Sequence, residues 1–165
     1  MKYNFVNNLS REFFKNIVAS DCQIIAIGEM SDDDEALSEL GLDNQRAINL
    51  VDGIFKQEGI RISSIENYVS ALICDGQIVG GATFGSYNEE GQQVFTFSVA
   101  IDSKYQGRGF GKKLVQDVMS LASGEGYFNV WVVNPNMAKL LESMGFETES
   151  SRGWSQDSPH MTYYP

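Results

Sequence analysis

The sequence predicts a single α/β domain, residues 1–165, whose mixed and mostly antiparallel central sheet has helices on both faces. Three observations predict this fold. Strand-like runs fill residues 68–101, amphipathic helical segments lie before and after them, and a strand–helix–strand unit spans residues 94–133. A chain of 165 residues is also long enough to bury its own core as one domain.

The N-terminal third reads mostly as helix. Residues 9–20 predict a helix capped by Ser10, whose buried face would hold Phe13, Phe14, Ile17 and Val18. A second helix is predicted from Asp43 to a stop at Gly59. Between them, the four carboxylates of residues 32–35 fit either a solvated loop or helix start, or a shell around a cationic ligand.

From Asn67 onward the apolar period changes to that of strands. The runs at residues 68–74, 77–87 and 92–101 are separated by Asp75-Gly76 and "NEEG", which predicts an antiparallel meander. A helix at residues 109–123 and a buried strand at 127–133 follow, so the strands on either side of that helix should be parallel. A further helix should run from an Asn134 cap to Gly145, before two short final strands.

Composition excludes several classes of function. The formal charge is −10 and the pI about 4.4, which argues against a nucleic-acid partner. No apolar run suits a membrane span or a signal peptide. With two cysteines and a single histidine, no metal site is expected, and Cys22 and Cys74 are expected to be reduced, Cys74 as a small core residue. The expected location is the cytoplasm.

The stretch "YQGRGFGKKLV", residues 105–115, is a glycine-rich cationic corner at the start of a predicted helix. A helix start offers unpaired N–H groups that bind phosphate, and glycines let a ligand approach them. Cations are disfavoured there unless an anion joins them, so the corner indicates an anion site; a tight turn with solvated lysines is the alternative. The spacing fits neither a Walker A loop nor a dinucleotide fingerprint.

"QGRGFG", residues 106–111, resembles the Q/R-x-x-G-x-G/A signature of the GNAT superfamily of N-acetyltransferases. The preceding "VAIDSKY" and the later "NPNMAKLLESMGF" resemble the surroundings of that signature, and the resemblance covers residues 67–164 well and the N-terminal third loosely. It implies a GNAT-like fold, with acetyl-CoA as co-substrate and a small amine or basic peptide as acceptor.

The resemblance also implies roles for individual residues. The backbone amides of the glycine corner would hold the pyrophosphate of coenzyme A: Gln106, Gly107, Arg108, Gly109, Phe110, Gly111 and Lys112. The main chain of Val99, Ala100 and Ile101 would pair with the pantetheine arm, and the Val99 amide would polarise the thioester carbonyl. Asn134 would contact the arm, cap its helix, or do both.

Two departures from the family pattern leave the general acid and base unassigned. Leu141 stands where the family often has a tyrosine that acts as the general acid. Residues 94–101, the strand on which many members carry a glutamate base, contain no carboxylate. Tyr163 and Tyr164 are candidates for a relocated acid, although packing in the core and on the surface would also explain them. The leading hypothesis is an N-acetyltransferase without a metal, whose acidic surface favours a cationic acceptor. The alternative is a module of the same fold that binds coenzyme A or an acyl-CoA in a regulatory or partner-binding role.

Overall fold

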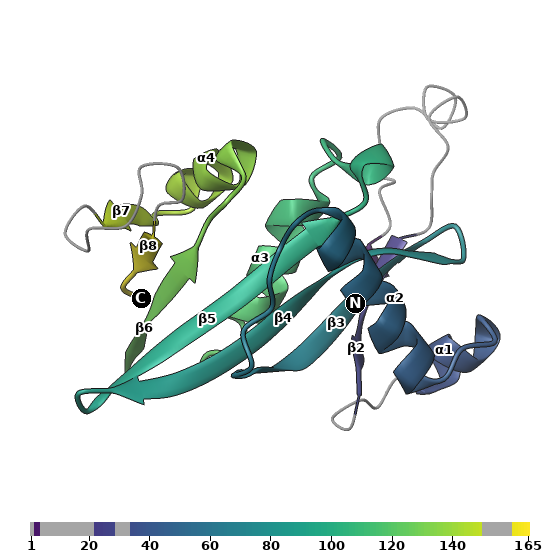
Figure 1. Cartoon of the computed structure of the whole chain (residues 1–165), viewed down its shortest axis with the longest axis horizontal. Coiled ribbons are helices and arrows are strands. Elements are labelled where there is room, and N and C mark those ends of the chain that lie inside the picture. Colours follow the sequence, from purple (N-terminus) through teal and green to yellow (C-terminus); the bar gives the residue numbers. More distant parts are fainter. Residues whose placement is uncertain (1, 4–21, 29–33, 150–159) are drawn as a thin grey trace.

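An eight-stranded sheet organises the residues that this computed structural model describes, which are 2–3, 22–28, 34–149 and 160–165 (Figure 1). The strand order is β1-β2-β3-β4-β5-β6-β8-β7, and β5–β6 is the parallel pair. The strands are β1 Lys2–Tyr3, β2 Cys22–Ile27, β3 Glu66–Cys74, β4 Gln77–Glu89, β5 Gln92–Ile101, β6 Gly126–Trp131, β7 Glu147–Glu149 and β8 His160–Tyr163. The mixed, mostly antiparallel sheet is therefore confirmed.

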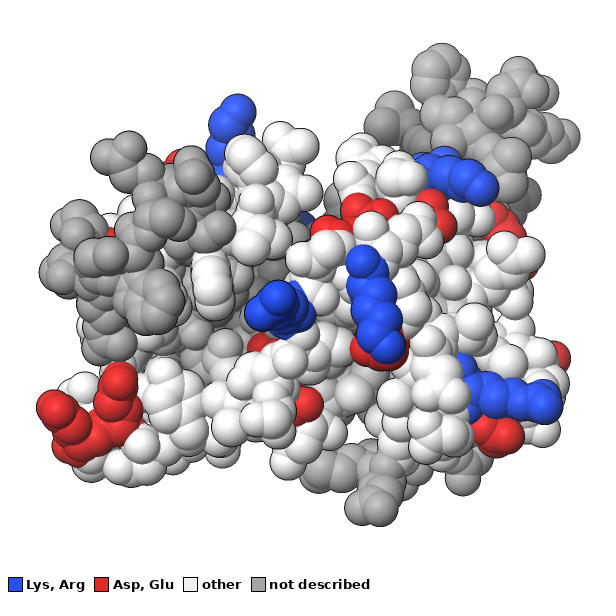
Figure 2. Space-filling model, viewed as in Figure 1, with Lys and Arg blue, Asp and Glu red and all other residues white. Residues whose placement is uncertain are grey.

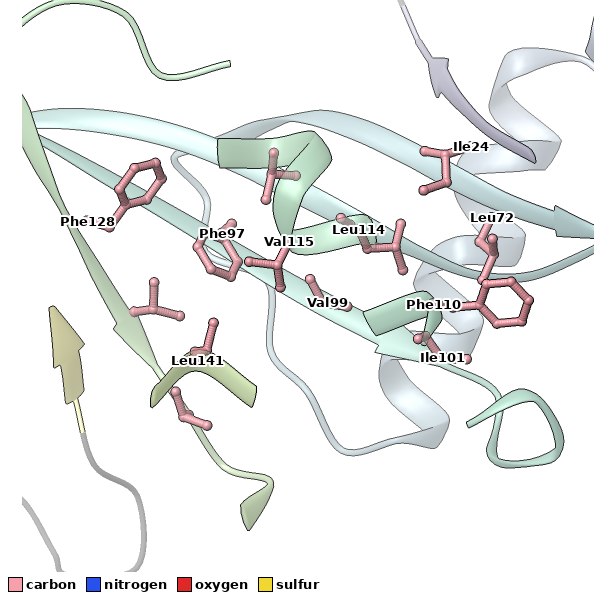
Figure 3. Packing of buried hydrophobic residues seen from close by; sticks show 14 of the residues in the cluster. Ile24, Leu72, Phe97, Val99, Ile101, Phe110, Leu114, Val115, Phe128 and Leu141 are labelled. Atoms are coloured by element: carbon pink, nitrogen blue, oxygen red, sulfur yellow. The ribbon is translucent and has the colours of Figure 1, made fainter. Parts of the chain in front are cut away.

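Helices cover both faces of the sheet, as predicted. They are α1 Asp34–Glu39, α2 Asn44–Gln57, α3 Phe110–Met119 and α4 Pro135–Ser143, with a 3₁₀ turn at Ser103–Tyr105. Helices α1 and α2 pack on one face of the sheet over a first cluster of buried apolar side chains. Helices α3 and α4 pack on the other face over a second cluster. Figure 3 shows the second cluster, in which Phe110 and Leu114 of α3 lie near Val99 and Ile101 of β5. No described helix is long and apolar enough to span a membrane.

Local signals in the sequence placed several elements correctly. Asp43 caps α2 by accepting a hydrogen bond from Arg46 N–H at 2.8 Å, and Gly59 ends the helix with a φ of +70°. Asp75 and Gly76 both have positive φ and form the two-residue turn between β3 and β4. These positions could be predicted from the sequence because caps and tight turns depend on the backbone preferences of one or two residues.

The expectation of a mostly helical N-terminal third is wrong for residues 22–27, which form β2 inside the sheet. The run "CQIIAI" is short and almost wholly apolar, and it pairs along its full length with β3. Such a run suits a strand covered on both faces. The helix predicted at residues 9–20 lies outside the described residues, and of the acidic run only Asp34 and Glu35 are described, at the start of α1.

Cys22 and Cys74 form a disulfide that joins β2 to β3, so the expectation that both are reduced is wrong. The two strands place them directly opposite each other with their Cα atoms 4.3 Å apart, although 52 residues separate them in sequence. Cys74 is buried, as expected. Because disulfides are uncommon in the cytosol, this pair gives no support to the cytoplasmic location, which stays a prediction.

Candidate active site

A cleft of about 950 Å³ lies where β5 and β6 separate. The two strands are in register only at residues 93–95 and 126–128, and beyond this point they diverge (Figure 1). Among the described residues, residues 96–101 of β5 therefore have β4 as a strand neighbour but none on the β6 side. The walls of the cleft come from the α2–β3 connection, the middle of β5, the glycine corner and the β6–α4 connection.

Most of the predicted site residues line this cleft. The structure brings nine of them together: Val99, Ala100, Ile101, Gln106, Gly107, Gly109, Gly111, Lys112 and Asn134. Arg108 and Phe110 do not line it. Phe110 is buried in the core beneath α3, and Arg108 Nη2 donates to the Lys104 carbonyl at 3.0 Å while the guanidinium lies 5.0 Å from the centroid of the Tyr105 ring. Lys112 is thus the cation of the glycine corner that faces the cleft.

The glycine corner has the backbone shape that an anion site needs. Gly107 and Gly109 have φ values of +74° and +83°, and an added Cβ at either would meet no atom within 4 Å. Gly109 is the N-cap of α3, so the first amides of that helix lie at this corner. Gln106 Nε2 donates to the Ile101 carbonyl at 2.8 Å, which ties the corner to the end of β5. Open space therefore adjoins a fixed set of helix-start amides.

Alternation along β5 sends its side chains to opposite faces of the sheet. Val99 and Ile101 belong to the core under α3 and α4, whereas Ala100 packs with the core under α2. Ser98 points to the same side as Ala100, where its hydroxyl contacts Glu66. The cleft is lined from both sides, so the gap between β5 and β6 connects the glycine corner on one face with Glu66 on the other.

Glu66 supplies the carboxylate that β5 lacks, and it comes from β3. Its register with Gly85 is followed by an irregularity between Glu66 and Tyr68, a feature that re-aims side chains. An added Cβ at Gly85 would collide with the Ile65 carbonyl oxygen and lie 2.8 Å from Glu66 Cα, so glycine is required for this close approach. The Glu66 side chain thereby crosses over β4 and reaches Ser98 of β5.

The Glu66 carboxylate is buried and held by two donors. The side chain is 8% exposed and lines the cleft. Ser63 N–H donates to Oε2 at 2.7 Å, and the Ser98 hydroxyl lies 3.0 Å from Oε1 and 3.1 Å from Oε2. Burial raises the pKa of Glu66 above the ordinary glutamate value, and the hydrogen bonds from Ser63 and Ser98 oppose part of that rise. A carboxylate in this setting is suited to accept a proton.

The C-terminal end of β6 carries an exposed aromatic ring into the cleft. Trp131 is 57% exposed and stacks on His160 of β8, with the ring centroids 5.8 Å apart. His160 Nδ1 lies 3.0 Å from Asn129 Oδ1, so the stack is tied to β6. All three residues line the cleft, and because Val130 belongs to the core under α3 and α4, alternation places Asn129 and Trp131 on the opposite face, with Ser98.

The residues considered for contact with the pantetheine arm or as the general acid do not meet at one place. Asn134 Oδ1 accepts from Asn136 N–H at 2.8 Å and caps α4 while also lining the cleft. Leu141 is fully buried, as packing alone requires. Tyr163 packs against Phe146, with ring centroids 5.1 Å apart, and Tyr164 is 70% exposed; neither lines the cleft. The candidate relocated acids thus take the core and surface positions that alternation indicated.

Comparison with known proteins decides the family. The profile of the Acetyltransferase (GNAT) family matches residues 55–146, which is more than half of the chain. This chain belongs to the GNAT acetyltransferase family. It is an acyltransferase, and the matched segment contains β5, the glycine corner and the Asn134 helix, on which the sequence resemblance depended. A comparison of this chain with curated proteins gave no match.

Solved structures share the GNAT fold at low sequence identity. Escherichia coli ElaA is 12% identical, with a TM-score of 0.58 and coverage of 87% of this chain and 98% of its own. Arabidopsis thaliana NAA60 in complex with acetyl-CoA is 17% identical, with a TM-score of 0.53 and coverage of 87% and 98%. A phosphinothricin acetyltransferase of Sinorhizobium meliloti in complex with acetyl-CoA is 13% identical, with a TM-score of 0.53 and coverage of 87% and 88%.

Sequence reasoning missed Glu66, Ser98 and Trp131 as site residues. Glu66 and Ser98 are 32 residues apart, and no linear spacing relates them. The signal that was present is an acidic residue at the start of an otherwise apolar strand run, at "IENYVSALIC". Within the described part of the chain, no group of three or more His, Cys, Asp or Glu side chains is arranged to hold a metal ion.

Proposed function

We propose that this GNAT enzyme transfers the acetyl group of acetyl-CoA to a cationic primary amine within a ternary complex. The observation that carries the proposal is the continuity of the cleft. It joins a helix-start anion site, a β5 edge without a strand neighbour, and a buried carboxylate.

The glycine corner fits the pyrophosphate of coenzyme A. Added Cβ atoms at Gly107 and Gly109 would occupy open space, and Lys112 lines the same part of the cleft. The amides from residue 106 to residue 112 would bind the pyrophosphate, because a helix start combines unpaired donors with a positive dipole end. The edge of β5 at Val99 to Ile101 would pair with the pantetheine amides as a neighbouring strand does.

The reacting end lies where β5 passes Glu66. When bound, acetyl-CoA supplies an acetyl group that is activated as a thioester. The Val99 N–H would donate to the carbonyl oxygen, on which negative charge develops. Glu66 would accept a proton from the ammonium group of the acceptor. The freed lone pair then forms the C–N bond while the C–S bond breaks, and the sulfur leaves as a thiolate. The nitrogen loses its remaining extra proton to the thiolate or to solvent, which leaves a neutral amide.

The charge of the protein supports a cationic acceptor. The chain carries a formal charge of −10, and Figure 2 shows Lys and Arg side chains scattered over the face in view, several of them beside Asp or Glu, with acidic side chains gathered over the tip of the β4–β5 hairpin. A field of this sign raises the encounter rate of cations and weakens with salt. Among acceptors of similar size, we expect higher kcat/KM for cationic amines than for neutral or anionic ones, with the difference shrinking as salt is added.

The test is release of free thiol from acetyl-CoA in the presence of a panel of amines, with a reaction without amine as the control for hydrolysis. Thiol release that depends on an amine, together with an acetylated product of matching mass, supports the proposal. A protein that binds acetyl-CoA but releases no thiol with any amine contradicts the transfer. A preference for an anionic acceptor at low salt contradicts the cationic assignment.

A further inference from the structure

Exposed apolar side chains gather at the cleft. Among the described residues, the exposed large hydrophobics are Leu50, Ile65, Trp131, Val133 and Tyr164. Three of these five, Ile65, Trp131 and Val133, line the cleft and are 37%, 57% and 49% exposed. Exposed apolar surface that is concentrated in one concave place marks a binding site more often than scattered exposure does. We call these three side chains the apolar rim.

The apolar rim belongs to both walls of the cleft. Ile65 directly precedes β3, whereas Trp131 ends β6 and Val133 lies in the β6–α4 connection. The Trp131 ring is held in place by its stack on His160, with an interplanar angle of 19°. A fixed aromatic face opposite an aliphatic side chain is a surface on which a flat apolar group can pack.

The same cleft contains one buried carboxylate. Glu66 directly follows Ile65 in the chain, and Trp131 and Ser98, the partner of Glu66, project from the same face of the sheet. A ligand that contacts both features needs an ammonium group at one point and an apolar body at another. A second ammonium group on the apolar rim would give up part of its hydration for at most a contact with the Trp131 ring face, whereas an apolar body gains burial there.

We infer that the acceptor is a small monoamine whose ammonium group meets Glu66 while its aromatic or bulky apolar body packs on the apolar rim. This inference rests on the proposed acetyl transfer and narrows it. Long-range attraction by the acidic surface alone would favour a polyamine over a monoamine. The apolar rim predicts that a monoamine has the higher kcat/KM. Packing of its apolar body inside the cleft should raise kcat/KM more than the faster encounter of a polyamine does.

The experiment measures kcat/KM with saturating acetyl-CoA for 2-phenylethylamine, n-butylamine and putrescine. Butylamine and putrescine differ only by the second ammonium group, and phenylethylamine adds an aromatic ring. We expect phenylethylamine to exceed butylamine, and butylamine to exceed putrescine, by at least tenfold each. Trp131→Ala should lower kcat/KM for phenylethylamine at least tenfold and for butylamine by a smaller factor, whereas Trp131→Phe should retain most of the phenylethylamine activity.

Tyr164→Ala is the matched control. It also removes an exposed aromatic ring, one that stacks on Tyr127 with centroids 5.2 Å apart and does not line the cleft, so kcat/KM should not change. A kcat/KM for putrescine that equals or exceeds that for butylamine overturns the inference. A Trp131→Ala variant that keeps the wild-type ratio of kcat/KM for phenylethylamine to that for butylamine also overturns it. Absence of turnover with all three amines, in a protein whose melting temperature rises with acetyl-CoA, also overturns it. Absence of that thermal response would instead overturn the proposed function.

Discussion

The hydroxyl of Ser98 lies 3.0 Å from Oε1 and 3.1 Å from Oε2 of Glu66, and it links the buried carboxylate of β3 to the middle of β5. Ser98 directly precedes Val99, whose amide is the proposed donor to the thioester carbonyl. This contact therefore ties the proposed base to the proposed reaction centre, and it is the basis of the first two predictions.

Glu66→Gln should lower kcat by about 10²- to 10⁴-fold, the usual loss when an acid–base group is removed. In the wild type, kcat/KM should fall as pH drops through the pKa of Glu66, which burial places above its ordinary value of 4.5. The variant should lack this acidic limb and keep its thermal response to acetyl-CoA. Glu142→Gln is the control, because Glu142 is exposed on α4 and does not line the cleft. Normal rates in Glu66→Gln would exclude it as the base.

Ser98→Ala should move the acidic limb of the pH profile to higher pH. The Ser98 hydroxyl stabilises the charged carboxylate and so opposes the effect of burial on the pKa of Glu66. Without this hydrogen bond, that pKa should rise further, and more of the enzyme should carry a protonated Glu66 at a given acidic pH. The profile of kcat/KM from pH 5 to 9 measures the shift. A limb that stays in place would mean that Glu66 does not produce it.

Gly109→Val should abolish the rise in melting temperature that acetyl-CoA causes. A side chain at Gly109 would fill the open space beside the first turn of α3. Gly124→Val is a matched control, since Gly124 has a φ of +84°, meets no atom within 4 Å of an added Cβ and does not line the cleft. Both variants should lose stability from the strained backbone, but only Gly109→Val should lose the ligand response. Loss of the response in both would point to unfolding rather than a blocked site.

Leu141→Ala should cost stability and spare the chemistry. Leu141 is fully buried in the core that α3 and α4 cover, so removing it should destabilise the fold by about 2–5 kcal/mol. Its effect on kcat should stay below the ~10²-fold loss that marks an acid–base group. Denaturant unfolding and kcat at saturating acetyl-CoA separate the two effects.

Tyr163→Phe and Tyr164→Phe should both show near-normal kcat, and a hundredfold drop in either would identify a relocated acid.

Asp117→Asn should stabilise the protein at neutral pH. Burial raises the pKa of Asp117 above its ordinary value of 3.8, and the nearby Ser70 hydroxyl opposes only part of that rise. The folded state therefore binds a proton more tightly than the unfolded state, and wild-type stability falls as pH rises between the ordinary and the raised pKa. The stabilising effect of Asn should be complete above this window and vanish below pH 3.8.

Thermal unfolding at pH 7 and pH 3.5 measures this difference for Asp117→Asn. Glu142→Gln, at an exposed position on α4, should change little at either pH. An Asp117→Asn variant that is less stable than wild type at pH 7 would show that the charged carboxylate gains more from its surroundings than burial removes.

Features that depend on neighbouring residues could be predicted from the sequence. Asp75-Gly76 specified a tight turn, Asp43 and Asn134 specified helix caps, and the glycine corner specified a helix start. Each of these signals comes from the conformational preference or the hydrogen-bonding group of a residue within a few positions. They were sufficient to predict the α/β fold and nine of the residues that line the cleft.

Which distant residues meet depends on the pairing of the strands and could not be predicted from the sequence. The register of β3 with β4, the glycine at position 85 and the irregularity after Glu66 together bring that carboxylate to Ser98. The pairing of β2 with β3 likewise brings Cys22 to Cys74 and makes a strand where a helical third was expected. Strand register follows from the packing of whole faces against the core, and a shift of one residue would send every side chain to the other side. No local spacing encodes that choice.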